Sequence, residues 1–420
     1  MTSSIFMWPR KQLDIDWCDL AFGLGQTLCA RRSPGGPDVV GAEWIAAEEA
    51  LVALSVRSGL DLLFTALNLP AGSEVITSAV TISDVPRIIE QHGLRVVPVD
   101  VEAERLIVEV DQLERAVTPK TRIVLVAHLF GSRMEMEPII ALARRHDLLV
   151  IEDCAQAFVG TEYAGHPESD CVLFSFGPIK TATALGGAVV RVRNGGLRAR
   201  MTELQHDYPT QSRSSYARRL IKYAGLGVLG WPRVYGAAVE LLKWRGADFD
   251  RLFANAARSF AGGDFFSRIR QQPSTPLVKM VARRVATFGE VGAARLQLRT
   301  RRGRELAAVL PASMVVGSWN ATHTFWVTPV RVRNREALVA ALRAGGFDAT
   351  VRSSLVFLAK KTESCAGEFK LAPWLNEIVF LPNGDGMPDS EWQRMRSIVR
   401  QTAIAVAVNR SSEPAGLAGV

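Results

Sequence analysis

The chain has 420 residues, of which 48% are hydrophobic and only 22% are charged. This composition is typical of a globular chain with a large core and excludes a disordered one. The length suffices for a large α/β domain with a smaller one beside it. The formal net charge is +8, and the five cysteines are odd in number with no C-x-x-C pair. They favour a reducing compartment over a disulfide framework or a zinc site, so we expect no metal.

The positive charge gathers in one part of the chain. Residues 191–305 contain 23 Lys and Arg against 8 Asp and Glu, an excess of +15. Such a region can attract nucleic acid, an anionic membrane surface or an anionic substrate. Because no helix-turn-helix or zinc-finger pattern accompanies it, we expect no nucleic-acid partner.

The chain begins with an N-terminal arm, which we place at residues 1–50. It has no basic stretch followed by an apolar core, so we expect no secretory signal and a cytoplasmic location. A Pro- and Gly-rich stretch at 33–37 predicts a loop, and residues 42–54 have a helical composition. The next helix is predicted over 56–67, with Ser58 as its N-cap. A helix N-terminus attracts phosphate through its unpaired N–H groups and its dipole.

Strands and helices then alternate. Residues 74–78, 96–99 and 123–127 are predicted strands with helical segments between them, which indicates an α/β fold with a mostly parallel sheet covered on both sides. His128 follows the last of these strands. Two interpretations of His128 stay open, a structural hydrogen bonder and a substrate contact.

A further buried strand, residues 148–153, ends in the acidic pair Glu152 and Asp153. In an open α/β sheet, ligands bind outside the carboxyl ends of the strands. Asp153 is therefore placed to hold the nitrogen of a pyridine ring, because a carboxylate beside that nitrogen keeps it protonated. A protonated ring withdraws electrons from a carbanion.

The next apolar run, residues 171–176, ends in a Gly-Pro turn followed by Lys180, and a second run follows at 188–192. Taken alone, Lys180 is best interpreted as a surface-loop lysine, because lysine is rarely buried. The other interpretation is a lysine that forms a Schiff base with pyridoxal 5′-phosphate, PLP. The acidic strand end at Asp153, 27 residues upstream, favours the interpretation of Lys180 as a lysine that binds PLP.

Seven short segments together resemble the DegT/StrS family of PLP-dependent sugar aminotransferases. They are 72–76, 97–100, 118–122, 126–131, 151–156, 174–180 and 186–190. They occur in the family's order and at close to its spacing. The resemblance is good over residues 50–192 and looser over 275–400.

The resemblance implies a fold-type-I PLP-dependent transferase, with the large PLP-binding domain at 51–204. In such an enzyme Lys180 carries PLP and moves the proton as general acid–base. The resemblance assigns the other cofactor contacts to Asp153, Gln156, Ser175, Ser58 and Arg57. Ser175 and Gln156 are also residues that commonly satisfy local backbone groups. The chain departs from the family twice, with Arg57 and Ser58 in place of a Gly-Thr pair and Ile82 in place of a stacking aromatic residue.

The family pattern is lost over residues 205–275, where we expect a basic, apolar, helical insertion. Its uninterrupted apolar run, residues 223–231, has nine residues, far fewer than the ~20 of a spanning helix. Cations flank Leu, Val, Trp and Tyr over residues 216–245, a composition suited to a helix lying in anionic headgroups. A helical insertion packed on a partner subunit is an equal alternative.

The remaining chain is divided into a connecting helix at 276–312, a small C-terminal α+β domain at 313–408 and a tail at 409–420. A strand is predicted over 323–332, a helix over 335–344 ended by a glycine pair, a strand over 378–382 and a final helix over 389–399 with Ser390 as N-cap. Arg284 and His323 are candidate substrate contacts. The family's Asn-x-Arg stretch that reaches into the partner subunit's site is missing, and Arg284 is one candidate to replace it.

These observations predict a PLP-dependent aminotransferase that moves an amino group from glutamate or glutamine to a keto-sugar, nucleotide- or lipid-linked, or to a keto-cyclitol. The resemblance implies a homodimer. Two alternatives stay open. One is a PLP-dependent sugar dehydratase, although such relatives replace the lysine. The other is a non-catalytic PLP-binding or regulatory homologue.

Overall fold

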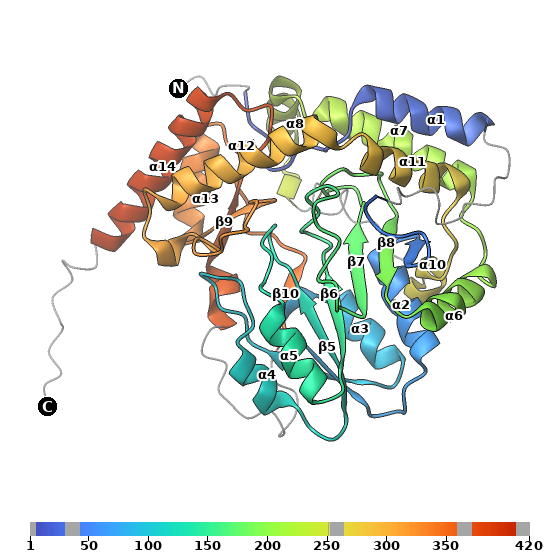
Figure 1. Ribbon diagram of the computed structural model, residues 1–420. Coiled ribbons are helices and arrows are strands. Elements are labelled where there is room, and N and C mark those ends of the chain that lie inside the picture. The colour runs from blue at the N-terminus through green and yellow to red at the C-terminus, as the bar shows by residue number, and fades with distance from the viewer. Residues whose placement is uncertain (1–5, 30–42, 251, 253–263, 359–371, 409–420) are drawn as a thin grey trace, which may run out of the picture.

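The computed structural model describes residues 6–29, 43–250, 252, 264–358 and 372–408. Its centre is a seven-stranded sheet in the order β1-β8-β7-β6-β5-β2-β4, with helices on both sides (Figure 1). The strands of this sheet are β1 (Ala50–Ala53), β2 (Glu74–Ser78), β4 (Arg95–Val99), β5 (Thr121–Ala127), β6 (Leu149–Asp153), β7 (Cys171–Ser175) and β8 (Ala188–Val192).

The sheet is parallel from β4 to β7 and antiparallel at β7–β8 and β8–β1. The prediction of a mostly parallel α/β sheet is thus confirmed. Residues 50–53 were expected to be helical, and this prediction is wrong. They form the edge strand β1, because their alternate side chains pack into two different cores on the two faces of the sheet.

Two helical layers cover the sheet. On one face of the sheet, side chains of α2, α3, α6 and α10 pack in one buried cluster. On the other face, α5 covers one end of the sheet, and α1, α7 and α11 cover the end nearest β8. The bounds are α1 (Trp17–Cys29), α2 (Val56–Leu67), α3 (Asp84–Gln91), α4 (Val110–Ala116), α5 (Glu137–Arg145), α6 (Gly195–His206), α7 (Arg213–Leu229), α8 (Pro232–Trp244), α10 (Phe265–Ile269) and α11 (Thr275–Ala286). Neighbouring strand residues such as Val75 and Ile76 alternate between the two cores.

The C-terminal part packs around its own apolar cluster. α12 (Gly289–Ala307) runs across the top of the molecule from α11 to this part (Figure 1). The other elements there are β9 (Thr328–Arg331), α13 (Arg335–Ala344), β11 (Ile378–Leu381) and α14 (Asp389–Val408), and β9 pairs antiparallel with β11. A separate two-stranded ladder joins β10 (Leu355–Phe357) to β3 (Val80–Ile82) of the large domain.

Several local predictions can be compared with these elements. The helix over 335–344 is confirmed, with Gly345 as its C-cap. The strand expected over 323–332 is shorter and covers only β9. Ser390 is not an N-cap, because α14 already begins at Asp389. The loop predicted at 33–37 and the tail at 409–420 lie outside the described residues.

The leading segment, which we define as residues 6–16, ties the two parts together. Trp8 packs into the apolar cluster of the C-terminal part, and Arg10 forms a two-pronged ion pair with the buried carboxylate of Asp348. Further along, Asp14 accepts a hydrogen bond of 3.0 Å from the backbone N–H of Ala182. The segment therefore passes from the small domain to the loop that follows β7.

Candidate active site

Three parallel strands end side by side at one edge of the sheet. Ala127 at the end of β5 pairs with Asp153 at the end of β6, and Asp153 pairs with Leu173 in β7. The chain leaves β7 at Ser175 and reaches Lys180 through a tight turn, in which the Lys180 N–H donates to the carbonyl of Gly177 over 3.0 Å. The strand order thus brings Asp153 and Lys180 to the same edge, as the sequence predicted.

Lys180 lies in a setting that favours its neutral amine. Burial lowers the pKa of its ammonium to about 8, although the carboxylate of Asp153 opposes this shift and the guanidinium of Arg57 adds to it. The Nζ atom lies 4.4 Å from the ring centroid of Trp326. The indole N–H of Trp326 in turn donates to the carbonyl of Ile179 over 3.1 Å. An amine whose pKa is close to neutrality can act both as a nucleophile and as a base.

The loop after Lys180 is held in a strained shape. Ala182 and Leu185 have positive φ values of 51° and 60°, which L residues adopt at a cost and mostly at functional sites. Gly187 has a φ of 82°, and a Cβ at this position would lie 2.6 Å from Val281. Only glycine fits this position without a shift.

Side chains from three elements fix this loop. Tyr216 and Arg219 of α7 donate to the carbonyls of Ala184 and Leu185 over 2.8 and 3.1 Å. Arg284 of α11 donates to the carbonyl of Thr183 over 3.1 Å. The N–H of Ala182 also donates to Asp14 of the leading segment. These four hydrogen bonds fix one backbone group of each residue from 182 to 185. The position of Lys180 is therefore set by elements distant in sequence.

Asp153 is half-buried and forms no ion pair with any residue that the structure describes. Burial raises the pKa of its carboxyl, and the N–H of Ala155, which donates to Oδ1 over 2.9 Å, and the charge of Lys180 only partly oppose that shift. A buried carboxylate with a raised pKa gains from a cationic group placed against it. The protonated nitrogen of a pyridine ring is such a group.

The predicted phosphate contacts lie around the start of α2. The N-cap is Ser55 rather than Ser58, so that prediction is wrong: the helix begins at Val56, and the Ser55 hydroxyl accepts from the N–H of Ser58 over 3.2 Å. Ser58 is buried, and its hydroxyl lies 2.9 Å from that of Ser55. Arg57 pairs with Asp84 of α3. Its charge still influences both Lys180 and Asp153, which puts the N-terminus of α2 near the lysine.

Ser175 and Gln156 both make local contacts. The Ser175 hydroxyl accepts from the N–H of Gly177 over 3.3 Å, and the Gln156 amide oxygen accepts from the N–H of Phe130 over 2.8 Å. Gln156 therefore fixes the loop after β5 beside the edge of the sheet. Ile82 is half-buried and packs with the cluster under α2 and α3, where Ala155 also packs.

His128 is fully enclosed and uses both ring nitrogens. Its Nδ1 accepts from the N–H of Met134 over 3.0 Å, so the proton is on Nε2, which lies 3.0 Å from Glu152. Tyr163 and the His166 N–H also donate to the Glu152 carboxylate. Burial alone would raise the pKa of Glu152, but its interactions with His128 and Tyr163 outweigh burial and lower it to about 2. Glu152, His128 and Cys154 come close to one another, but the oxygens of Glu152 are occupied by these donors.

The two other proposed substrate contacts are also engaged. Arg284 is buried and pairs with Asp19 and Asp14 besides its bond to the lysine loop. His323 is buried and stacks on Phe325 with ring centroids 3.9 Å apart. Burial lowers the pKa of His323 to about 3, helped by the charge of Arg304, so its ring is neutral at physiological pH. Arg284 thus contacts the loop after Lys180, whereas His323 stacks on Phe325 of the C-terminal part.

The sequence analysis missed Lys11 and Trp326. Trp326 contacts two lysines, because the Lys11 Nζ also lies 4.4 Å from its ring centroid and donates to its carbonyl over 2.8 Å. Trp326 follows the motif His323-Thr-Phe that the sequence marked, and the cluster of aromatic residues there was the only available signal. Lys11 gave no signal, because only the path of the leading segment brings it to the site.

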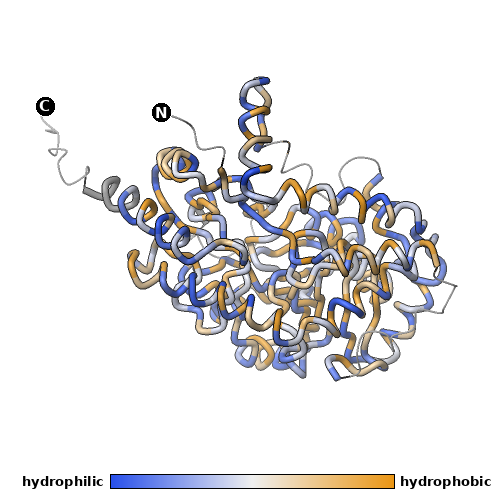
Figure 2. The backbone as a smooth tube through the Cα atoms, turned by 90° about the horizontal axis from the view of Figure 1, so that it is seen from above, coloured by the Kyte–Doolittle hydropathy of each residue, from blue (hydrophilic) through white to orange (hydrophobic). Residues whose placement is uncertain are grey.

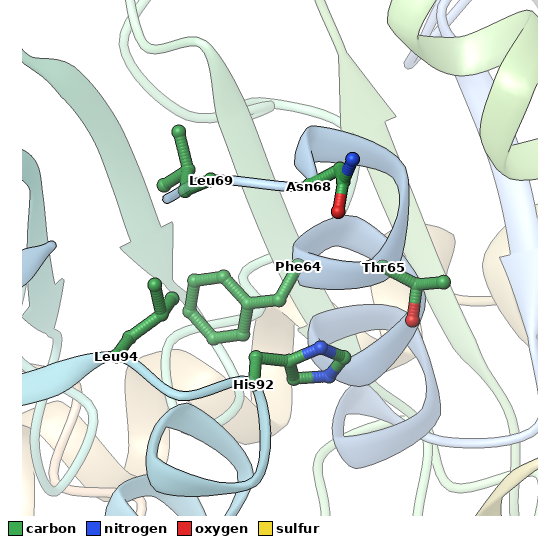
Figure 3. Close-up of a pocket in the computed structure, with 6 residues that line it drawn as sticks. All are labelled: Phe64, Thr65, Asn68, Leu69, His92 and Leu94. Carbon is green, nitrogen blue, oxygen red and sulfur yellow. The ribbon is translucent and has the colours of Figure 1, made fainter. Parts of the chain in front are cut away.

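A small pocket opens elsewhere in the large domain and does not mark this site. It has a volume of about 130 Å³ and is lined by Phe64, Thr65, Asn68, Leu69, His92 and Leu94 (Figure 3). These residues surround the C-terminal end of α2, whereas Arg57 and Ser58 are at its N-terminal end. Its volume is below the ~300 Å³ of the smallest usual cofactor pockets.

Residues 40–225 match the family model described as the DegT/DnrJ/EryC1/StrS aminotransferase family. This part of the chain is similar to that family. It contains the strand ends that bear Asp153 and Lys180, so the resemblance seen in the motifs is confirmed. The DegT/DnrJ/EryC1/StrS match stops within α7, so it does not include α8 or the C-terminal part of the chain.

Two relatives are similar over less than half of the chain. One is UDP-4-amino-4-deoxy-L-arabinose–oxoglutarate aminotransferase of Shewanella sediminis, 32% identical over 161 residues, which are 38% of this chain and 41% of that protein. The other is GDP-perosamine synthase of Caulobacter vibrioides, 32% identical over 167 residues, or 39% of this chain and 45% of that protein. The chain therefore spans less than half the length of these relatives.

The whole fold has counterparts among solved structures. The PLP form of the putative sugar aminotransferase Spr1654 from Streptococcus pneumoniae superposes with a TM-score of 0.65 and covers 96% of this chain and 100% of that one, at 15% identity. This similarity extends the shared fold to the C-terminal part, where the sequence match has ended. The fold class predicted from the sequence, that of fold-type-I transferases, is confirmed by it.

Proposed function

We propose that this protein is a PLP-dependent aminotransferase that acts on a keto-sugar. The observation that carries the proposal is the pair formed by Asp153 and Lys180 at adjacent parallel strand ends. The half-buried carboxylate has no ion-pair partner among the described residues, and the pKa of the amine is lowered to about 8. The similarity of residues 40–225 to an aminotransferase family supports it.

The residues present fit PLP. Lys180 offers an amine for the aldehyde, Asp153 offers a carboxylate for the ring nitrogen, and the start of α2 with Ser58 and Arg57 offers donors and positive charge for the phosphate. Ser175, at the end of β7, and Gln156, after β6, are placed at the same edge. We propose these six residues as the cofactor contacts.

When bound, PLP supplies the electron sink that makes the carbon beside the amino group acidic. The protein's own part is to hold Asp153 ionised against the ring nitrogen and to move a proton with the Nζ of Lys180. A pKa of about 8 suits this work, because a catalytic group is most effective when its pKa is near the working pH. The packing of Trp326 and the fixed loop after Lys180 limit how far that nitrogen moves.

Glutamate or glutamine is the proposed amino donor, and a nucleotide-linked keto-sugar the proposed acceptor. Support comes from the similarity to proteins named as UDP-4-amino-4-deoxy-L-arabinose–oxoglutarate aminotransferase and GDP-perosamine synthase. Lipid-linked keto-sugars and keto-cyclitols stay within the proposed class. His128 is better explained as a structural hydrogen bonder that positions the loop after β5, since both its nitrogens are engaged.

One experiment separates this function from its alternatives. The purified protein is mixed with PLP, and then with glutamate, while absorbance and released 2-oxoglutarate are recorded. An aminotransferase converts the absorbance of lysine-bound PLP to that of pyridoxamine phosphate and releases one 2-oxoglutarate per site. A non-catalytic homologue binds PLP with no release. A dehydratase would eliminate water from a keto-sugar nucleotide and leave no amino group on the sugar product.

We further propose that the basic helix pair, α7 and α8, docks on an anionic membrane surface. No helix among the described residues has the length and hydrophobicity needed to cross a membrane. The helix pair exposes Ile221, Trp231, Leu241 and Trp244, the last with 81% of its surface accessible. Five cations are also exposed on the pair, namely Arg218, Lys222, Arg233, Lys243 and Arg245.

The charge of this face favours a membrane over a second copy of the chain. The only acidic residue of the helix pair is Glu240, and it pairs with Lys243 over 2.8 Å. In a two-fold symmetric contact centred on this face, the cations of one subunit would meet those of the other. An anionic lipid surface instead attracts each cation, while Trp and Leu side chains enter the headgroup region. Figure 2 shows how hydrophobic and hydrophilic residues alternate along the helices on this side of the molecule.

We also propose a homodimer located in the cytoplasm, with the helix pair at the inner face of the membrane. The family resemblance supports the dimer, and α1 exposes Trp17 and Leu28, with 52% and 83% of their surfaces accessible. Exposed large apolar side chains on one helix are typical of a contact surface. Sedimentation equilibrium measures the mass in solution, and a monomer at all concentrations would contradict this proposal.

A further inference from the structure

A second cluster of cations lies beside Lys180, and it is built from parts of the chain far apart in sequence. Lys11 comes from the leading segment, Arg295 and Arg299 come from α12, and two carboxylates, Asp14 and Asp385, face them. Burial lowers the pKa of Lys11 to about 7, and the charges of Arg299 and Lys180 add to this while Asp385 and Asp14 oppose it. The cluster therefore has more cations than anions.

Arg299 is the member without a partner. Its side chain is buried, with 5% of the residue accessible, and its Nε and Nη2 have no hydrogen-bond acceptor among the described residues. Asp14 is engaged elsewhere, because it binds Arg295, Arg284 and the N–H of Ala182. The charge of Asp385 acts on Arg299, but Asp385 accepts no hydrogen bond from its Nε or Nη2. A buried guanidinium with unpaired N–H groups is costly unless a ligand supplies the acceptor.

The two unpaired nitrogens of Arg299, Nε and Nη2, are the atoms through which other arginines of this chain bind a carboxylate. Arg10 binds Asp348 through Nε and Nη2, and Arg270 binds Asp61 through the same two atoms. These N–H groups lie along one edge of the guanidinium, whose spacing fits two oxygens of a carboxylate or phosphate. Arg299 thus presents an unused edge of the same kind.

We propose that Arg299 and Lys11 form an oxyanion subsite beside Lys180, which binds a carboxylate or phosphate group of a substrate. The subsite rests on the proposed function for its role, since an anion held here belongs to the molecule on which Lys180 acts. Two sources have the right chemistry, the carboxylates of a dicarboxylic amino donor and the phosphates of a nucleotide-linked sugar. The ring of Trp326 links the subsite to Lys180, because Lys11 and Lys180 both lie 4.4 Å from its centroid.

The first test needs no turnover. PLP-loaded protein, in which the phosphate contacts at α2 are already filled, is titrated with succinate and with inorganic phosphate while its melting temperature is followed. The parent protein is expected to bind at least one of them, and Arg299→Gln and Lys11→Met to weaken that binding about tenfold or more, as for loss of a charged hydrogen-bonding partner. Arg301→Gln is the matched control, because Arg301 is exposed on the same helix and pairs with Asp389.

The second test identifies the source of the anion. The two half-reactions are measured separately, glutamate with the PLP-loaded enzyme and amino-sugar nucleotide in the reverse direction. A rise of KM for glutamate alone in Arg299→Gln, with kcat within about twofold, assigns a carboxylate, and a rise for the nucleotide alone assigns a phosphate. Unchanged anion binding and unchanged KM values in both arms would overturn the subsite. If the parent protein catalyses neither half-reaction, the proposed function fails while the melting experiment still decides the subsite.

Discussion

Lys11 and Lys180 place their ammonium nitrogens at equal distances, 4.4 Å, from the ring centroid of one indole, that of Trp326. The two lysines are 169 positions apart, and the path of the leading segment brings them together. A ring face attracts cations, but two ammonium groups at one ring repel each other, and Lys180 is among the charges that lower the pKa of Lys11. The pair therefore tends to carry one proton fewer than two exposed lysines would at neutral pH.

The first prediction concerns stability against pH. Folding lowers the pKa of Lys11 to about 7 from an unfolded value of about 10.4. Below pH 7 the burial penalty is therefore present in full, and between pH 7 and 10.4 the unfolded state binds more protons, so stability rises with pH. Lys11→Met should remove its part of that rise, which is at most about 1.4 kcal/mol per pH unit for one group. The part that comes from Lys180, whose pKa is lowered to about 8, should remain. Urea unfolding of the protein without PLP, at several pH values, measures it.

The control for this experiment is Lys120→Met, since Lys120 is exposed. Its free energy of unfolding should follow that of the parent protein at every pH. Parallel curves for Lys11→Met and the parent would show that Lys11 keeps an ordinary pKa in the folded protein.

The second prediction concerns Lys180→Ala. This variant should fold, because the loop is held by Tyr216, Arg219 and Arg284 and not by the lysine side chain. It should lose the absorbance of lysine-bound PLP and all amino transfer. After borohydride reduction, the parent protein should carry the cofactor mass on the peptide that contains Lys180, and the variant should carry none. Cofactor mass found on Lys11 instead would move the attachment site to the other lysine.

The third prediction concerns Asp153→Asn. The amide cannot hold the ring nitrogen protonated, so PLP should still bind while its reaction with glutamate becomes slower by about 100-fold or more. Stopped-flow absorbance measures this single half-reaction. An equal rate in variant and parent would remove Asp153 from the site. Glu104→Gln, a surface change elsewhere, should leave the rate as it was.

Much of the sheet could be predicted from the sequence. The strand ends that carry Asp153 and Lys180 follow from apolar runs and from the turn residues after them, which are local signals. The edge strand β1 was mistaken for helix, because its residues Ala50–Ala53 have good helical propensity. Pairing with β8 outweighs that propensity, and such pairing is a tertiary effect.

The residues that the leading segment and α12 bring to the site could not be predicted from the sequence, and the reason is physical. Lys11, Asp14 and Arg299 reach Lys180 only because the leading segment crosses between the domains and α12 spans them. The hydrophobic periodicity within those segments does not indicate that they cross from one part of the molecule to the other. Arg284 was proposed as a substrate contact, and the structure brings it to the loop after Lys180, where Asp19 and Asp14 pair with it.

The fourth prediction concerns that ion pair. Asp19 is buried and binds Arg284 and Arg283, so Asp19→Ala leaves the buried guanidinium of Arg284 with Asp14 as its remaining charged partner. This should lower the free energy of unfolding by about 1–3 kcal/mol. Glu240→Ala is the matched control, because it breaks an exposed pair with Lys243 that is worth ~0.5 kcal/mol or less. Urea denaturation gives both values, and equal effects would mean that Asp19 is not a buried anchor.

The fifth prediction tests docking of the basic helix pair on a membrane. In flotation with phosphatidylglycerol vesicles at low salt, the parent protein should rise with the vesicles and be released at high salt. Each exposed cation near an anionic surface contributes about 1 kcal/mol, so Arg218→Glu with Lys222→Glu should weaken binding by about 30-fold or more. Arg219 is left unchanged, because it holds the loop after Lys180.

The control is the double variant Lys120→Glu and Arg122→Glu, which reverses two exposed cations at the start of β5, away from α7 and α8. Its vesicle binding should equal that of the parent, since these cations do not belong to the basic helix pair. Trp244→Ser tests the apolar part and should weaken binding even at low salt, because Trp244 is exposed at the end of α8. A parent protein that stays with the soluble fraction would contradict docking. Equal losses in the two double variants would mean that net charge, and not this face, drives the binding.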